Sequence, residues 1–275
     1  MSGQDQFIDV DGASLRVRAT GEGPAVVLVH GWALDLDMWQ AQIETLERRH
    51  RVIAFDRRGF GQSSGVPGIE QDVEDIERLL DRLGVMQATI VGMSQGARVA
   101  LRWAMKHSQR TRRMVLDGPP REGLSPARES SEEIPIKQYR ELVRHEGVEA
   151  FRAQWLQHPL MHLQTCEWNS HRLLRQMAAR YPARDLQADE PLPLSPLTER
   201  ELRRVNVPTL ILNGEHDSEQ RRSSAAHLAQ ALPHARLKII PAAGHLAALD
   251  NPDAYTQALH EFFSSQPLFA AGALT

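Results

Sequence analysis

A serine flanked by glycines is the strongest chemical signal in the sequence. Residues 92–96 read Gly-Met-Ser-Gln-Gly, directly after an apolar run and directly before a helical pattern. Glycines two positions either side of Ser94 permit a sharp strand-to-helix turn, which holds the serine in a strained backbone conformation and presents its hydroxyl at the edge of a sheet. The helix that begins near Gln95 favours negative charge at its N-terminus, where an oxyanion would form. We therefore predict that Ser94 is a nucleophile.

A serine hydroxyl needs a general base, and the base needs a carboxylate that orients it. His245 lies in a loop of small residues after the last apolar run, and Asp217 follows the run before it. The chain order serine, acid, histidine is the one expected for a nucleophile in a strand-to-helix turn. Glu215 and Asp117 also follow apolar runs and are alternatives for the acid, but we favour Asp217.

A second oxyanion donor is expected from the loop after an earlier strand. His30, Gly31 and Trp32 follow the apolar run 25–29, and Gly31 lets the backbone approach a substrate closely. The backbone N–H groups of Trp32 and Gln95 are the predicted oxyanion pair. We expect His30 to hydrogen-bond within this loop and brace it rather than to act as a base.

Short apolar runs separated by helical patterns predict the elements that position these residues. The runs are β-branched and end at Gly, Pro or Asp, which indicates parallel strands buried on both faces by helices, an α/β fold. Residues 7–10 and 14–19 predict an antiparallel hairpin at the sheet edge. The other predicted strands are 25–29, 52–55, 89–93, 114–116, 209–212 and 237–240, and the predicted helices are 72–83, 95–107, 222–231 and 253–263.

The alternation of strands and helices stops between about residues 121 and 205. This stretch has helical patterns at 136–145, 148–157 and 171–181 but no clear strand, and it is too long for a structureless loop. We expect an α/β core domain built from residues 1–120 and 206–275, with residues 121–205 forming a helical cap over one edge of the sheet.

An apolar stripe in the predicted cap is expected to face the sheet. Its members are Trp155, Leu156, Leu160, Met161, Leu163, Trp168, Leu173, Leu174 and Met177. Such a stripe is core packing in the first place, and part of it can also line a cavity. The predicted substrate pocket consists of Trp155, Leu160 and Met161 from the stripe, with Trp32 and Met93 beside the nucleophile. These residue types favour a small, mainly apolar substrate.

Composition narrows the classes of protein. The 32 Lys and Arg residues against 35 Asp and Glu argue against a nucleic-acid binder. One cysteine, Cys166, excludes an intrachain disulfide and a multi-cysteine zinc site, and we expect a buried or idle thiol. His158, His162 and His171 lack the spacing of metal ligands, so we expect a solvated or packed role for them.

The chain has no apolar run of membrane-spanning length and no signal-peptide pattern, so we expect a cytoplasmic protein. The apolar segment 267–275 either packs on a partner subunit or is disordered. The oligomeric state is left open.

Together these motifs resemble the α/β-hydrolase superfamily over about residues 7–264. The resemblance rests on residues 30–32 (HGW), 56–63 (DRRGFGQS), 92–96 (GMSQG), 214–217 (GEHD) and 244–245 (GH). Residues 30–32 and 56–59 are similar to the cofactor-free haloperoxidase or perhydrolase esterases, although those usually have Phe where this chain has Met93. Residues 35–39 (DLDMW) are similar to the 3-oxoadipate enol-lactonases, which usually differ before this segment. We expect residues 56–63 to be structural, with their Asp and Arg side chains paired locally.

The resemblance and the three chemical residues imply a serine hydrolase that cleaves a small, mainly apolar carboxylic ester or lactone through an acyl-enzyme, with no metal or organic cofactor. The same triad can hydrolyse carbon–carbon bonds in vinylogous diketones or form peracids, and these activities remain alternatives. A ligand receptor with low turnover on the same fold is a further one. Haloalkane dehalogenases and epoxide hydrolases are disfavoured, because both use an aspartate where this chain has Ser94.

Overall fold

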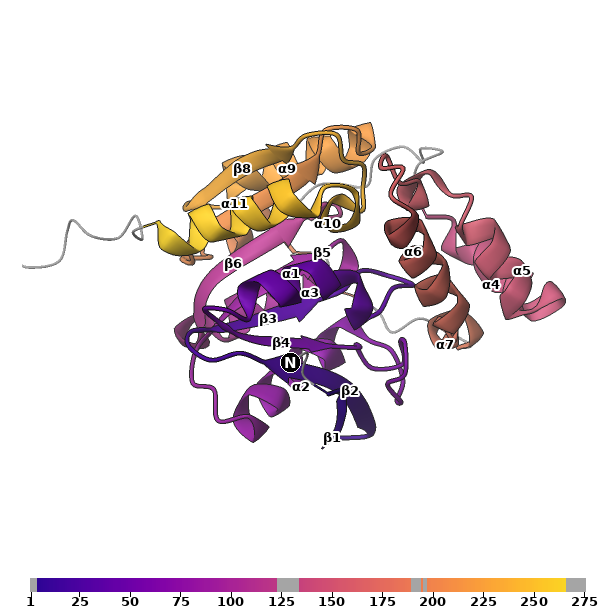
Figure 1. Cartoon of the computed structure of the whole chain (residues 1–275), viewed down its shortest axis with the longest axis horizontal. Coiled ribbons are helices and arrows are strands. Elements are labelled where there is room, and N and C mark those ends of the chain that lie inside the picture. The colour runs from indigo at the N-terminus through magenta and orange to yellow at the C-terminus, as the bar shows by residue number, and fades with distance from the viewer. Residues whose placement is uncertain (1–3, 123–133, 189–193, 195–196, 266–275) are drawn as a thin grey trace, which may run out of the picture.

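A mostly parallel sheet of eight strands forms the centre of the protein (Figure 1). In the computed structural model, which describes residues 4–122, 134–188, 194 and 197–265, the strand order is β1-β2-β4-β3-β5-β6-β7-β8. The first two strands, β1 (Gln6–Val10) and β2 (Ala13–Thr20), form the predicted antiparallel hairpin, and β2 also pairs antiparallel with β4. All other pairings are parallel. These strands are β3 (Ala25–Val29), β4 (Arg51–Phe55), β5 (Ala88–Met93), β6 (Thr111–Asp117), β7 (Thr209–Gly214) and β8 (Ala235–Ile240).

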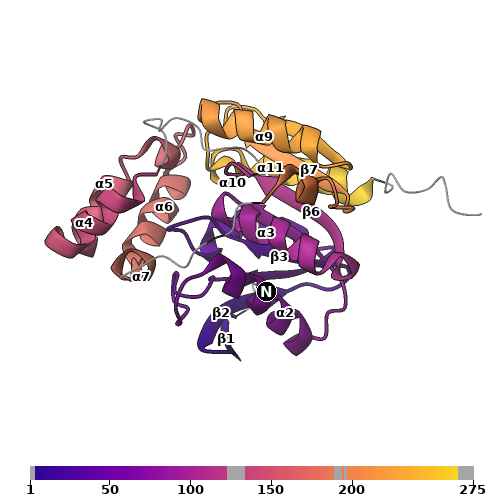
Figure 2. The same ribbon diagram turned by 180° about the vertical axis from the view of Figure 1, so that it is seen from behind.

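Helices cover both faces of the sheet, which confirms the predicted α/β fold (Figures 1 and 2). One face carries α1 (Gln40–Leu46) and α11 (Pro252–Ser264), and the other carries α2 (Ile69–Arg82), α3 (Gln95–Lys106) and α9 (Glu219–Ala231). Alternate residues of β3 separate accordingly. Val26 and Leu28 belong to the core with α1 and α11, whereas Val27 and Val29 belong to the core with α2, α3 and α9. The central strands are therefore apolar at every position because both of their faces are buried.

The long stretch between β6 and β7 is helical, as its periodicity predicts. It contains α4 (Ile136–Glu146), α5 (Val148–Trp155), α6 (Trp168–Arg180), α7 (Arg184–Gln187) and α8 (Glu199–Leu202), and α4 to α7 group together at one end of the sheet (Figures 1 and 2). We refer to α4–α7 as the inserted helices. The division into a core domain and a cap domain stays a prediction, and the segment 267–275 lies outside the described residues.

One sequence expectation for this region is wrong. Trp168 was expected to face the sheet, but its side chain is 65% exposed and stacks against the guanidinium of Arg172, 5.0 Å from the ring centroid. Nine residues separate Trp168 from the buried Met177, which places the two on opposite faces of α6. Cys166 is exposed, which excludes the first of the two roles expected for it, a buried or an idle thiol. Among the described residues, none of the helices has both the length and the apolar character needed to cross a bilayer.

A single carboxylate connects the inserted helices to the loop that carries His245. Asp250, the last residue of α10 (Ala247–Asp250), accepts hydrogen bonds from the backbone N–H groups of Gln164 at 2.6 Å, Thr165 at 3.1 Å and Gly244 at 2.7 Å. Asp250 is only 7% exposed, and this burial raises its pKa despite the three donors. The contact fixes the backbone immediately before His245 relative to the segment between η3 (Pro159–Met161) and α6.

Replacing this carboxylate should destabilise the protein. Asp250→Ala leaves three N–H groups without their acceptor, so we expect a loss of about 2 kcal/mol in the free energy of unfolding, measured by urea denaturation. Asp253→Ala, in the exposed first turn of α11, is the matched control and should cost less than about 1 kcal/mol. Equal losses for the two variants would contradict a role for Asp250 in joining the segments.

Candidate active site

The turn at Ser94 has the strained geometry that its glycines predict. Ser94 has φ +51°, a left-handed value that is unfavourable for serine, and its N–H donates to the backbone oxygen of Asp117 at 2.7 Å. A Cβ atom on Gly92 would lie 2.1 Å from the backbone oxygen of Gly96, and one on Gly96 would lie 2.3 Å from that of Val29. Only glycine fits at both positions, so the chain can turn sharply from β5 into α3 with Ser94 at the bend.

The structure brings Ser94, His245 and Asp217 together. His245 Nε2 lies 3.1 Å from Ser94 Oγ, and His245 Nδ1 lies 3.0 Å from Asp217 Oδ2. The other carboxylate oxygen of Asp217 accepts from the Ser218 N–H at 2.7 Å. Ser94 and His245 are each 6% exposed. These contacts orient the imidazole between the hydroxyl and the carboxylate, the arrangement needed for a base that receives the hydroxyl proton.

The two alternative acids occupy different positions. Glu215 points to solvent and accepts from the Ala242 N–H at 2.9 Å. Asp117 is fully buried beside Tyr255, and burial, followed by the charge of Asp217, raises its pKa well above the usual range. The neutral acid form is therefore favoured at Asp117, which makes it a poor partner for a developing imidazolium.

A glycine that the sequence analysis did not single out makes room for the imidazole. Gly118 follows β6 and has φ +48°. A Cβ atom built on Gly118 would lie 2.9 Å from both Cε1 and Nδ1 of His245. A glycine directly after a strand is the signal that could have identified it, since the carboxyl ends of parallel strands meet at one edge.

Each of the two residues that carry a predicted oxyanion donor is held by a hydrogen bond of its side chain. Gln95 begins α3, where backbone N–H groups have no partner within the helix, and its side-chain oxygen accepts from Arg57 Nη1 at 2.7 Å. Trp32 follows β3, and its indole Nε1 donates to Asp185 Oδ2 of α7 at 2.6 Å. Arg57 in turn forms a buried ion pair with Asp72 of α2 at 2.7 Å. We expected the Asp and Arg side chains of residues 56–63 to pair locally, but Arg57 pairs with Asp72 of α2 and contacts Gln95, so this expectation is wrong for Arg57.

His30 braces the loop, as expected. Its Nε2 accepts from the Arg57 N–H at 2.9 Å, so its Nδ1 carries the proton and donates to the Gly31 oxygen at 2.7 Å. Burial and the nearby Arg57 charge lower the pKa of His30 to about 3. His30 is thus neutral over the whole physiological range and is already engaged at both nitrogens.

A small apolar cavity surrounds the hydroxyl of Ser94. It has a volume of about 10 Å³, and all five predicted pocket residues line it. His158 is buried nearby, with Nδ1 accepting from the Leu160 N–H at 3.2 Å, and burial lowers its pKa to about 4. The lining residues other than Ser94 and His245 are Trp32, Leu34, Met93, Ile134, Trp155, Leu160, Met161 and Leu246.

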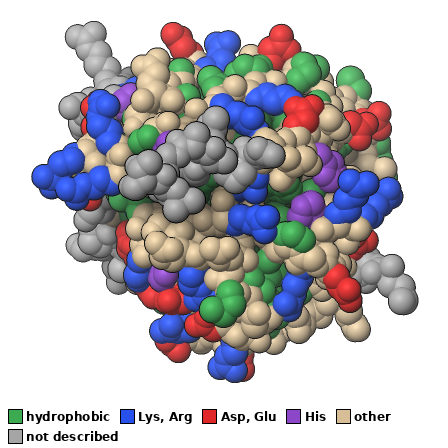
Figure 3. Space-filling view, turned by 90° about the vertical axis from the view of Figure 1, so that its left-hand side faces the viewer, with side chains coloured by type: hydrophobic (Ala, Val, Ile, Leu, Met, Phe, Trp, Pro, Cys, Tyr) green, Lys and Arg blue, Asp and Glu red, His purple; other side chains and the backbone are tan. Residues whose placement is uncertain are grey.

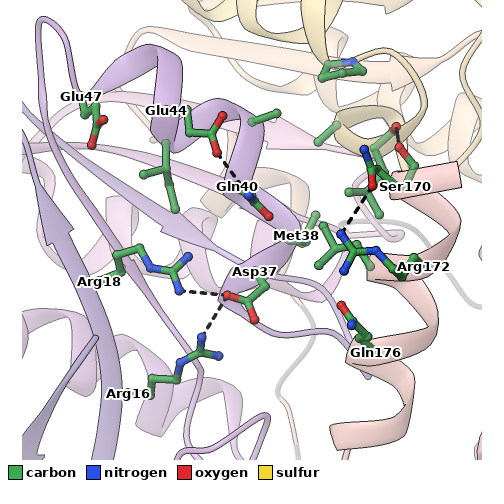
Figure 4. Close-up of a pocket in the computed structure, with 17 residues that line it drawn as sticks. Arg16, Arg18, Asp37, Met38, Gln40, Glu44, Glu47, Ser170, Arg172 and Gln176 are labelled. Carbon is green, nitrogen blue, oxygen red and sulfur yellow. Dashed lines mark hydrogen bonds and ion pairs between the residues drawn. The ribbon is translucent and has the colours of Figure 1, made fainter. Parts of the chain in front are cut away.

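A larger groove of about 640 Å³ lies elsewhere, between α1 and α6 (Figure 4). Figure 4 shows Arg16 and Arg18 reaching the same carboxylate of Asp37, at 2.9 and 3.1 Å. Neither Ser94 nor His245 lines this groove, and both arginines of β2 that line it are paired with Asp37. On the end of the molecule away from the inserted helices, basic and acidic side chains are interspersed (Figure 3). Size alone therefore does not identify the reactive site.

The described residues contain no cluster of three or more His, Cys, Asp or Glu side chains that could hold a metal ion. Besides Gly118, sequence reasoning missed Asp250 and the Arg57–Gln95 contact. Their partners lie 6 to 86 residues away in the chain, at separations that no short motif encodes.

The placement of His245 against Gly118 is testable. Gly118→Ala adds both backbone strain and a clash with the imidazole, so we expect kcat to fall about 100-fold with little change in KM. Gly84→Ala is the matched control, because Gly84 has φ +66° but no atom within 4 Å of its Cβ position. It should lose about 1 kcal/mol of stability and keep its kcat. If both variants retained kcat, the contact with His245 would be irrelevant to the reaction.

The comparisons with known proteins find relatives that match most of the chain. A pimeloyl-[acyl-carrier protein] methyl ester esterase of Nitrosospira multiformis is 26% identical over 260 residues, covering 88% of this chain and 95% of the relative. A putative non-heme chloroperoxidase of Synechocystis is 28% identical over 237 residues, covering 82% and 86%. The enol-lactonase structure of Burkholderia xenovorans LB400 superimposes with a TM-score of 0.79 at 25% identity, covering 94% of this chain and all of that one.

The expected resemblance to haloperoxidases and enol-lactonases is thus confirmed. The family described as alpha/beta hydrolase fold matches residues 24–252. The chain belongs to the α/β-hydrolase fold family.

Proposed function

We propose that the protein is a serine hydrolase of carboxylic esters or lactones. The observation that carries the proposal is the hydrogen-bonded series Ser94–His245–Asp217, buried at the carboxyl edge of the sheet. Relatives named as a methyl ester esterase and an enol-lactonase support the same bond type. The small apolar cavity beside Ser94 favours a short apolar group on one side of that bond.

The proposed reaction has two steps. Ser94 Oγ attacks the carbonyl carbon while His245 Nε2 takes the hydroxyl proton, and Asp217 stabilises the resulting imidazolium through Nδ1–H. The backbone N–H groups of Trp32 and Gln95 donate to the oxyanion, a contribution of about 3 kcal/mol for each donor in comparable sites. His245 then gives its proton to the leaving oxygen. Water that His245 activates finally releases the acid from Ser94.

Ser94→Ala should abolish hydrolysis of p-nitrophenyl acetate, with a loss of at least about 10⁴-fold in kcat and an unchanged circular dichroism spectrum. A fluorophosphonate should label the wild-type protein at Ser94 alone, as peptide mapping by mass spectrometry would report. Rapid labelling separates the enzyme from a receptor that binds without turnover. Hydrolysis that survives Ser94→Ala would reject the mechanism.

The identity of the acid is tested by two isosteric changes. Asp217→Asn removes the charge that holds the imidazolium, so we expect kcat/KM to fall about 10⁴-fold. Asp117→Asn replaces a carboxyl whose raised pKa already favours the neutral form, so the expected change is below about threefold. Steady-state kinetics on p-nitrophenyl acetate measures both, and a larger loss for Asp117→Asn would reverse the assignment.

A further inference from the structure

Two cavities meet at Ser94, and only one of them has charged side chains other than His245 among its described lining residues. The small apolar cavity is lined by the side chains of Met93, Trp155 and Leu160. A second cavity, of about 290 Å³, also reaches Ser94 and Gln95 but is wider and has charged as well as apolar side chains in its lining. An ester bound with its carbonyl carbon at Ser94 would therefore place one substituent in each cavity.

Three arginines from three different elements line the wider cavity, which we call the arginine cavity. Arg98 lies on α3, one helical turn after Ser94, and Arg221 lies in the first turn of α9. Arg121 follows β6. The remaining lining residues include Gln220 and apolar side chains but, among the described residues, no aspartate or glutamate. The segments after three neighbouring strands thus contribute positive charge to one place.

Arg98 keeps N–H donors for a further anion. Arg98 Nε donates to Glu122 Oε1 at 2.8 Å, and the same oxygen accepts from Arg102 Nη1 at 3.1 Å, so one buried carboxylate serves two guanidinium groups. Arg121 and Arg221 also interact within the protein. A guanidinium has five N–H donors, however, and a carboxylate can take two of them at once. The Arg98 side chain is 31% exposed, which leaves it accessible from the cavity.

The adjoining cavity on the other side of Gln95 lacks this character. Its volume is about 210 Å³, and it contains Arg57 and Arg140 but also Asp185. Arg57 is committed to Asp72 and Gln95, and the Arg140 guanidinium donates to the Asp185 backbone oxygen at 3.0 Å. Among the described residues that line the arginine cavity, all the charged side chains are therefore arginines.

We propose that the substrate is an ester with a carboxylate on the substituent that occupies the arginine cavity and a short apolar group on the other side. This inference rests on the proposed ester hydrolysis and narrows its substrate class to monoanionic esters. Guanidinium groups stay protonated at all physiological pH values, so the preference for the anion persists from pH 6 to pH 9. The near-neutral net charge of the whole chain does not contradict this proposal, because the positive charge of the three arginines is confined to one cavity.

The test compares monomethyl glutarate with dimethyl glutarate, which differ in one ionised carboxylate. We expect the wild-type protein to show a kcat/KM at least about tenfold higher for the monoanion, the size expected of one charge-assisted hydrogen bond. The ratio of the two kcat/KM values should fall at least fivefold in Arg98→Gln and in Arg221→Gln, mainly through KM. Arg112→Gln, which removes an exposed charge from β6, is the matched control and should keep the ratio.

Two results would overturn the inference while leaving ester hydrolysis intact. One is a wild-type ratio at or below one, and the other is an unchanged ratio in both Arg98→Gln and Arg221→Gln with folded proteins. If neither ester were hydrolysed, binding of monomethyl glutarate to Ser94→Ala, measured by calorimetry, would still decide the matter. Binding that weakens at least fivefold when Arg98→Gln is added supports the cavity assignment although the proposed function fails. An affinity equal to that for dimethyl glutarate rejects the assignment.

Discussion

The close crossing of two backbones at Gly92 and Gly96 is the constraint on which the rest of the site depends. No side chain fits between the end of β5, the start of α3 and the end of β3, so the chain has to bend at Ser94. The bend places the hydroxyl where the loops after β3, β6, β7 and β8 meet. Because these strands are parallel, their carboxyl ends lie along one edge, and a residue that follows any of them needs only a short loop to reach the serine.

Buried polar groups then fix the positions of these loops relative to one another. The Arg57–Asp72 ion pair is weak evidence for stability, since removing two charges from water costs free energy that their attraction only partly offsets. Its position explains it better, because Arg57 also holds the side chain of Gln95 and donates its N–H to His30. A network of this kind fixes the start of α3 and the loop after β3 relative to each other, and both carry predicted oxyanion donors.

The sequence was most informative for elements whose residue pattern follows directly from the burial of that element. Apolar runs predicted the strands β3 to β8, and most of these are buried on both faces. The hairpin pattern predicted β1 and β2 at the edge of the sheet. The short helices α1 and α10 were missed, since seven and four residues are too few for a periodicity to stand out. The prediction for Trp168 was wrong because this residue is apolar but lies on the outer face of its helix.

The residues of the candidate site also divide into those that the sequence predicted and those that only the fold brings together. Ser94, Asp217 and His245 were found from their place after apolar runs and from chain order, and the structure brings them within hydrogen-bonding distance. The sequence already favoured Asp217 over Asp117, and the fold adds the physical difference between them, because both follow strands and only their surroundings differ. The arginines around Ser94 were beyond the sequence altogether, since Arg98 and Arg221 become neighbours only when α3 and α9 lie side by side.

The order of the triad along the chain also bears on synthesis. Ser94 and His245 are 151 residues apart, and Asp217 and His245 follow the last two strands to be made. A chain still emerging from the ribosome therefore holds the serine without its base or its acid, and the edge of β6 is open until β7 pairs with it. In the proposed mechanism, Ser94 therefore gains its base and its acid only once the last two strands have joined the sheet.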